Sequence, residues 1–92
     1  MESPKKYKLV ISKKADKQLR KLDNATFRII TNWLRKNLEN CENPRAKGKG
    51  LVADHSGEWR YRVGDYRIIA DINDTEVVIL VVQVGHRRDI YE

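Results

Sequence analysis

The sequence predicts a small α+β domain spanning residues 1–92, with one strand, two helices and then three strands in chain order. Three observations indicate this class. Apolar residues recur at helical spacing between residues 13 and 40, strict alternation of apolar and charged residues begins at Trp59, and residues 77–84 are apolar except for Gln83. We expect an antiparallel sheet of about four strands, with the two N-terminal helices packed on one face.

Charge and length limit the possible functions. The chain has 92 residues, with 19 Lys and Arg against 13 Asp and Glu, so its formal net charge is +6. This charge favours an anionic partner, which includes nucleic acid, an acidic protein or an anionic membrane surface. Cys41 is the single cysteine and cannot form an internal disulfide, and no apolar segment approaches the ~20 residues of a membrane span. Because the polar N-terminus runs directly into a strand, we expect no signal peptide, no membrane partner and a cytoplasmic protein.

The first strand and helix follow a short polar lead, which we expect to be disordered. Residues 7–11 are predicted to form the strand, and Ser12 is a candidate helix N-cap. Apolar residues then recur at helical spacing, at Ala15, Leu19 and Leu22. Basic residues cover the rest of this helix, which is either a solvated outer face or a ridge that binds RNA phosphates through Lys13 and Lys17.

A second helix is predicted from about residue 25 to residue 40, with Asp23 or Asn24 as its cap. Its inward-facing residues are expected at Phe27, Ile30, Leu34 and Leu38. Ile29 and Trp33 are expected to widen this apolar stripe, and Trp33 is interpreted as a core residue.

The composition changes at residues 41–57, where Pro44 and several glycines predict a loop. This loop contains Arg45, Lys47 and Lys49, which are candidate RNA contacts, although a plain connector is an equal alternative. Its glycines do not match the phosphate-binding P-loop pattern and do not follow a strand.

The hairpin beyond the loop places like charges opposite each other. If Gly64 and Asp65 form a two-residue turn, Arg62 lies directly across from Arg67, with Cβ atoms roughly 5 Å apart. Alternation puts Arg60 and Arg62 on one face and the aromatic residues of the same strand on the other. Since like charges so placed repel, an anionic partner that neutralises them is a reasonable hypothesis. Residues 77–84 should form the most buried strand, in a central position.

The C-terminus, GHRRDIYE, follows that buried strand immediately. His86 therefore leaves the sheet at a defined place, and an imidazole side chain suits proton transfer at neutral pH, although a lone histidine is more often a surface residue. His55 in the loop is a weaker candidate. No pattern of metal ligands and no nucleophilic serine with its partners is visible, so we expect no metal and no cofactor.

The series W-R-Y-R-V-G-D-Y-R-I-I and V-G-H-R-R-D-I-Y, with the NPRAKGKGL loop before it, resembles the RelE/ParE superfamily of bacterial toxins, and the RelE branch most closely. The resemblance covers essentially the whole chain. It implies a ribosome-dependent endoribonuclease that cuts messenger RNA in the decoding site and is silenced by an acidic, RelB-like antitoxin in a hetero-oligomer. By the same resemblance, the functional residues are Arg60, Arg62, Arg67, Arg87 and Tyr91.

Arg60 and Arg62 depart from the family, whose best-known members have lysines at these positions. Arginine stays protonated in proteins and is a poor general base, so its role here is charge stabilisation. RNA cleavage without a metal needs the 2′-hydroxyl deprotonated, the pentavalent phosphate stabilised and the 5′-oxygen protonated. The arginines are candidates for holding the phosphate, and His86 or Tyr91 for moving the protons.

Two other classes of function compete with this interpretation. A ParE-like toxin shares the fold but poisons DNA gyrase as a binding module and is not a nuclease. A non-catalytic RNA-binding protein is the third interpretation. It has less support, because Trp59 and Tyr61 alternate onto the predicted core face and are not available for base stacking.

Overall fold

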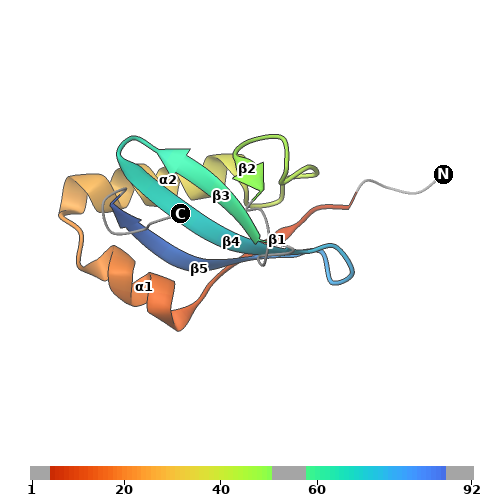
Figure 1. Ribbon diagram of the computed structural model, residues 1–92, viewed down its shortest axis with the longest axis horizontal. Helices are drawn as coiled ribbons and strands as arrows, with labels where there is room; N and C mark the ends of the chain where they lie inside the picture. The colour runs from red at the N-terminus through yellow and green to blue at the C-terminus, as the bar shows by residue number, and fades with distance from the viewer. Residues whose placement is uncertain (1–4, 51–57, 87–92) are drawn as a thin grey trace.

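The computed structural model describes residues 5–50 and 58–86, and in these ranges the chain forms two helices and five strands (Figure 1). In chain order they are β1 (Lys8–Ile11), α1 (Lys13–Arg20), α2 (Asn24–Asn37), β2 (Lys49–Gly50), β3 (Glu58–Val63), β4 (Tyr66–Asn73) and β5 (Val78–His86). His55, Arg87 and Tyr91 lie outside the described residues. The predicted class, two helices followed by a β-meander, is confirmed.

Side-chain caps start both helices. The Ser12 hydroxyl oxygen accepts a hydrogen bond from the Ala15 N–H at 3.1 Å, and a carboxylate oxygen of Asp23 accepts one from the Thr26 N–H at 3.2 Å. Each bond satisfies a backbone donor that has no partner within the helix. The Ser12 cap is as predicted, and Asp23 is the cap of the second helix. That helix ends at Asn37, three residues earlier than expected.

The sheet is mixed, which corrects the expectation of an antiparallel sheet. The strand order is β1-β5-β4-β3-β2, and β1 pairs with β5 in parallel while the other described pairings are antiparallel. A parallel neighbour requires a long crossover connection, which the helices and the meander supply here. In the described part of the chain, the sheet has one strand more than the four expected. This additional strand is β2, which consists of two residues in the segment predicted to be a loop.

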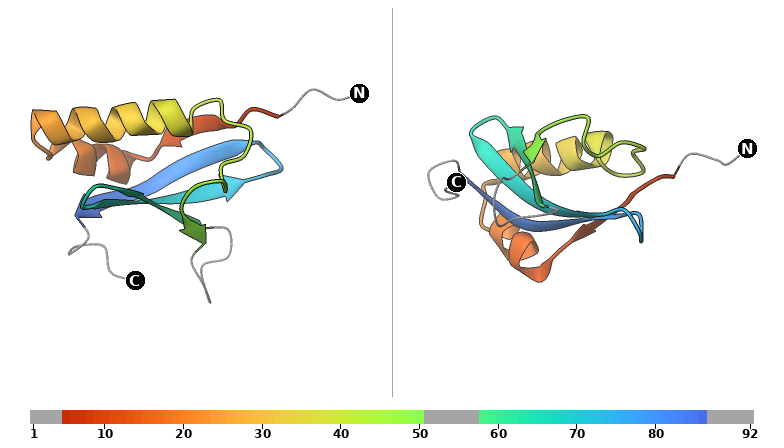
Figure 2. Two further views of the ribbon diagram at one scale, coloured as in Figure 1. Left: turned by 90° about the horizontal axis from the view of Figure 1, so that it is seen from above. Right: turned by 45° about the vertical axis from the view of Figure 1, so that its right-hand side comes forward.

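Both helices cover the same face of the sheet (Figure 2), as predicted. The core between the helices and the sheet is apolar. Its most completely buried side chains include Tyr61, Ile30, Leu34, Leu38, Ile68, Ile79, Val81 and Val84. Trp33 packs against this core with its ring centroid 5.5 Å from that of Tyr61. Ile29 does not widen the stripe as expected, because its side chain is 60% exposed on the outer side of α2.

A β-bulge in β5 changes the predicted burial of that strand. Ala70 pairs with Val81 and Ile69 with Gln83, so Val82 is an extra residue without a partner in β4. The bulge keeps Val81 and Val84 on the core side although they are three residues apart. As predicted, β5 has a neighbour on each side, and none of its residues is exposed, although β4, in the middle of the order, has more fully buried residues. The second face of β5 is only half-buried.

Candidate nucleic-acid interface

The predicted arginine pair is present on the face of the sheet opposite the helices. Val63 pairs with Tyr66 and Arg62 with Arg67, so the register inferred from the Gly64 turn is confirmed. Arg60 pairs with Ile69 two residues along the ladder, which places it on the same face as the pair. We call this surface, with Arg60, Arg62, Arg67 and Ile69, the arginine face.

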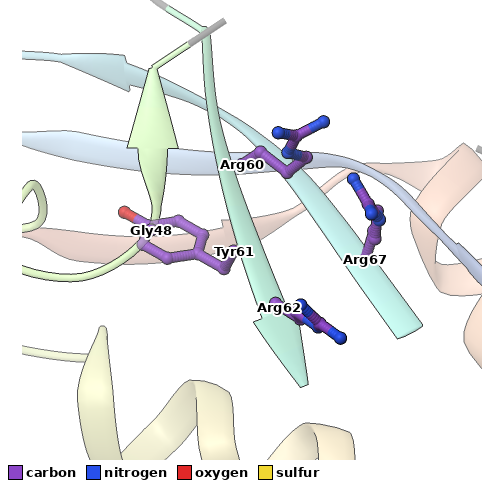
Figure 3. Close-up of a pocket in the computed structure, with 5 residues that line it drawn as sticks. All are labelled: Gly48, Arg60, Tyr61, Arg62 and Arg67. Atoms are coloured by element: carbon purple, nitrogen blue, oxygen red, sulfur yellow. The ribbon is translucent and has the colours of Figure 1, made fainter. Parts of the chain in front are cut away.

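The three arginines line one hollow of about 280 Å³, together with Gly48 and Tyr61 (Figure 3). Arg62 is exposed, whereas Arg60 and Arg67 are half-buried. Figure 3 shows their side chains extending from β3 and β4 away from Tyr61, which emerges on the other side of β3. Cationic side chains in a concave, partly desolvated site concentrate their field on an incoming anion. The arginine hollow is therefore suited to a phosphate group.

The hollow has a second wall that sequence reasoning missed, formed by the end of the 41–50 loop. Lys49 and Gly50 pair with Arg60 and Trp59 as strand β2. Gly48, just before them, has φ of 81°, and a Cβ atom there would overlap the carbonyl oxygen of Arg60. Only glycine fits this left-handed position against β3. The Gly-Lys-Gly sequence was the available signal, although it indicated a loop and gave no partner strand.

The three cations predicted in the loop differ in their surroundings. Lys47 is exposed, and the backbone of Lys49 pairs with that of Arg60. Arg45 forms an ion pair outside the hollow. Its guanidinium binds both carboxylate oxygens of Asp74, at 3.0 and 3.1 Å. Two aromatic side chains of β3 bind the same loop: Trp59 Nε1 donates to the Lys47 carbonyl at 2.6 Å, and the Tyr61 hydroxyl donates to the Pro44 carbonyl. Burial raises the pKa of the Tyr61 phenol, which therefore remains a donor at neutral pH.

The structure does not bring His86 together with the arginines. His86 pairs with Tyr66 in the ladder, and the two rings make an edge-on contact with centroids 5.4 Å apart. By alternation this pair belongs to the helix side of the sheet, since Val63, opposite Tyr66, is a core residue. His86 lines a separate hollow of about 300 Å³, whose other lining residues are Gln18, Lys21, Leu22, Tyr66, Gln83, Val84 and Gly85.

The lysines predicted on the first helix also lie apart from the arginine hollow. Lys13 and Lys17 are exposed on α1, which packs on the other face of the sheet through Ala15 and Leu19 (Figure 2). Within residues 5–50 and 58–86, no cluster of three or more His, Cys, Asp or Glu side chains is arranged to hold a metal ion. In the same part of the chain, no helix is long and apolar enough to span a membrane.

The described part of the chain is a small α+β domain with a basic hollow on the sheet face opposite the helices. Comparison with known families makes the assignment specific. Residues 9–91 match the model of the ParE toxin of the type II toxin–antitoxin system parDE, so the chain belongs to this toxin family, within the RelE/ParE superfamily.

Individual relatives agree with this assignment. Toxin RelG of Mycobacterium tuberculosis is 35% identical over 48 residues, which are 52% of this chain and 55% of RelG, so the chain matches about half the length of this curated relative. The toxin–antitoxin complex RelBE2 of M. tuberculosis has the same fold, with a TM-score of 0.81 at 23% identity over 95% of this chain and 98% of the matched one. The intact RelBE toxin–antitoxin complex of E. coli matches with a TM-score of 0.71 at 26% identity, over 87% of this chain and 95% of the other.

Proposed function

We propose that this toxin is a ribosome-dependent endoribonuclease that cleaves messenger RNA and thereby inhibits translation in the cytoplasm. The observation that supports this function is the arginine hollow, in which Arg60, Arg62 and Arg67 converge from two adjacent strands. Three cations at one concave site suit a phosphate that gains negative charge during the reaction. The resemblance of the chain to RelE toxins gives the substrate class.

The proposed reaction is a transesterification. The 2′-oxygen attacks the adjacent phosphorus, a new O2′–P bond forms and the P–O5′ bond breaks, which leaves a cyclic phosphate and a free 5′-hydroxyl. Arg62, with Arg60 and Arg67, stabilises the equatorial oxygens of the pentavalent intermediate. Because arginine stays protonated, these side chains do not accept the 2′-hydroxyl proton.

Proton transfer is assigned to His86 or Tyr91, and Arg87 adds a further positive charge. The contact of His86 with Tyr66 on the helix side favours Tyr91 as the group that acts at the phosphate. The other basic residues, which are Lys13, Lys17, Arg45, Lys47 and Lys49, contribute to RNA affinity in this proposal.

The second partner is an acidic antitoxin of the RelB kind. An apolar groove of about 150 Å³ lies between β1 and the two helices, lined by Leu9, Ile11, Asp16, Leu19, Phe27, Thr31, Leu34 and Arg35. β1 is at the end of the described strand order, so an added segment can bind both the groove and the strand edge. The similarity to solved toxin–antitoxin complexes supports this occupant.

A gyrase-inhibiting toxin is the second candidate function, favoured by the description of the matching family model, which is a ParE toxin. In that function the basic surface would bind a protein or DNA, and no RNA would be cut.

Primer extension on messenger RNA from cells induced for the toxin separates the two functions. We expect discrete cuts in translated RNA with wild-type protein, and far fewer with Arg62→Ala at equal expression. Intact messenger RNA together with double-strand DNA breaks would reject the nuclease and support the gyrase inhibitor.

A further inference from the structure

Asp74, on the turn between β4 and β5, joins three segments that are distant in the sequence. Its carboxylate accepts a hydrogen bond from the Tyr7 hydroxyl at 2.7 Å and a bidentate pair from the Arg45 guanidinium. The hydrogen bonds from Arg45 and Tyr7 lower the pKa of Asp74, so the group is ionised at neutral pH. A forked Arg–carboxylate pair fixes orientation as well as distance.

Arg45 extends this connection to the loop and to β3. Its guanidinium carbon lies 6.0 Å from the centroid of the Trp59 ring, within the range of a cation–π contact. Trp59 in turn donates to the Lys47 carbonyl, and Tyr61 to the Pro44 carbonyl. Residues 44–47, which we call the clamped segment, are thus bound to the β4–β5 turn and to two positions of β3.

The clamped segment continues directly into the wall of the arginine hollow. Gly48 follows it and packs against the backbone of Arg60, and β2 then pairs with the same strand. Since a side chain at Gly48 would overlap Arg60, there is little room for the segment to shift without disturbing this contact. Asp74 is thus connected, through Arg45 and the clamped segment, to the wall of a site that it does not line.

We propose that Asp74 is a positioning residue for RNA binding, acting through Arg45 to hold the basic loop against the arginine hollow. This inference rests on the proposed function for its ligand, single-stranded RNA. The expected contribution of Asp74 to RNA binding is opposite in sign to the effect of its charge. A carboxylate near a polyanion site should oppose binding by charge alone, so its removal should strengthen affinity unless the carboxylate holds the site in place.

The sign of the effect gives the test. We compare Asp74→Asn with Glu76→Gln, which changes the net charge equally at an exposed position two residues away. The measurement is the Kd for a fluorescein-labelled, mixed-sequence 20-nucleotide RNA, by anisotropy at fixed salt. We expect Asp74→Asn to bind roughly two- to fivefold more weakly than wild type, the range that coupling in an exposed ion pair allows, while Glu76→Gln binds as well or better.

Further variants distinguish positioning from direct contact. If Asp74 acts through Arg45, then Arg45→Ala weakens binding at least as much as Asp74→Asn, since it also removes a cation, and the double variant is no weaker than Arg45→Ala alone. Asp74→Glu, which retains the carboxylate, recovers most of the affinity. All variants should keep a Tm close to that of wild type, because the ion pair is partly exposed.

Two results would overturn the inference. In the first, Asp74→Asn binds RNA as tightly as Glu76→Gln does, while the wild-type protein still cleaves messenger RNA. This result rejects the positioning role alone and leaves the proposed function standing. Failure of the wild-type protein to bind this free RNA also rejects the inference, whereas the proposed function is rejected only by intact messenger RNA in the primer-extension experiment.

Discussion

Arg62 and Arg67 form a pair whose arrangement costs stability, and the proposed function gives this arrangement a purpose. Directly opposed like charges on neighbouring strands are destabilising, and the turn at Gly64 leaves them no other register. The sheet tolerates the pair because its stability comes from the other face, where Tyr61 and Ile68 are fully buried. Residues selected only for folding would not be arranged in this way.

Replacement of Arg62 should therefore separate stability from activity. Arg62→Ala is expected to leave the fold intact or to stabilise it by roughly 0.2 to 1 kcal/mol, because it relieves repulsion. Cleavage should fall on the order of a hundredfold or more, since a preorganised donor to the developing charge is lost. Thermal melting and messenger cleavage test this, with Arg28→Ala, an exposed arginine of α2, as the matched control.

Arg67→Ala gives the same test from the other strand. If Arg62→Ala cleaves at the wild-type rate and Arg67→Ala loses cleavage only because it unfolds the domain, the arginines are structural and the active site lies elsewhere.

The sequence predicted some residue positions and not others for a physical reason. The Arg62–Arg67 register followed from local information, a two-residue turn and strand alternation. The partner of Arg45 did not, because Asp74 is 29 residues away and no pattern links the two. Ile29 was assigned to the core from helical periodicity alone, yet the sheet does not extend over that side of α2 and the side chain is 60% exposed.

At the level of elements, local signals again determined what could be predicted. Caps and periodicity defined both helices, and turns defined the meander of β3, β4 and β5. The parallel pairing of β1 with β5 depends on contacts about 70 residues apart, and the bulge at Val82 depends on the register of that pairing and of β4. Neither has a local signature. The bulge is nevertheless what returns Val84 to the core.

The interior position of β5 makes it the strand least able to accept a charge. Val81→Asp places a carboxylate at a fully buried position between β1 and β4, and should destabilise the domain by ~4 kcal/mol or more. Lys17→Glu, on the exposed side of α1, should change stability by less than ~0.5 kcal/mol. Urea denaturation compares the two variants, and equal tolerance would mean that β5 is not part of the core.

At the level of the whole molecule, the two faces differ in chemistry. The arginine face has three cations around one hollow, whereas the groove between β1 and the helices is lined mainly by apolar side chains. Salt weakens electrostatic binding of RNA strongly, but it has little effect on apolar burial. One protein can thus bind two partners through forces that respond differently to ionic strength.

Salt titration should therefore separate the RNA from the antitoxin. The three arginines alone give a log–log slope of about −2 for a single strand, so raising salt from roughly 50 to 200 mM should weaken RNA binding at least about 20-fold. Antitoxin binding in the apolar groove should change by less than ~3-fold over the same range.

Anisotropy with labelled RNA and with labelled antitoxin measures both slopes, and Arg62→Ala should reduce only the RNA slope, by about 0.7. Phe27→Ala, in the groove, should weaken only the binding of the antitoxin. Equal salt slopes for the two partners would show that both depend on the same basic surface, and would contradict the division of the molecule into an RNA face and an antitoxin groove.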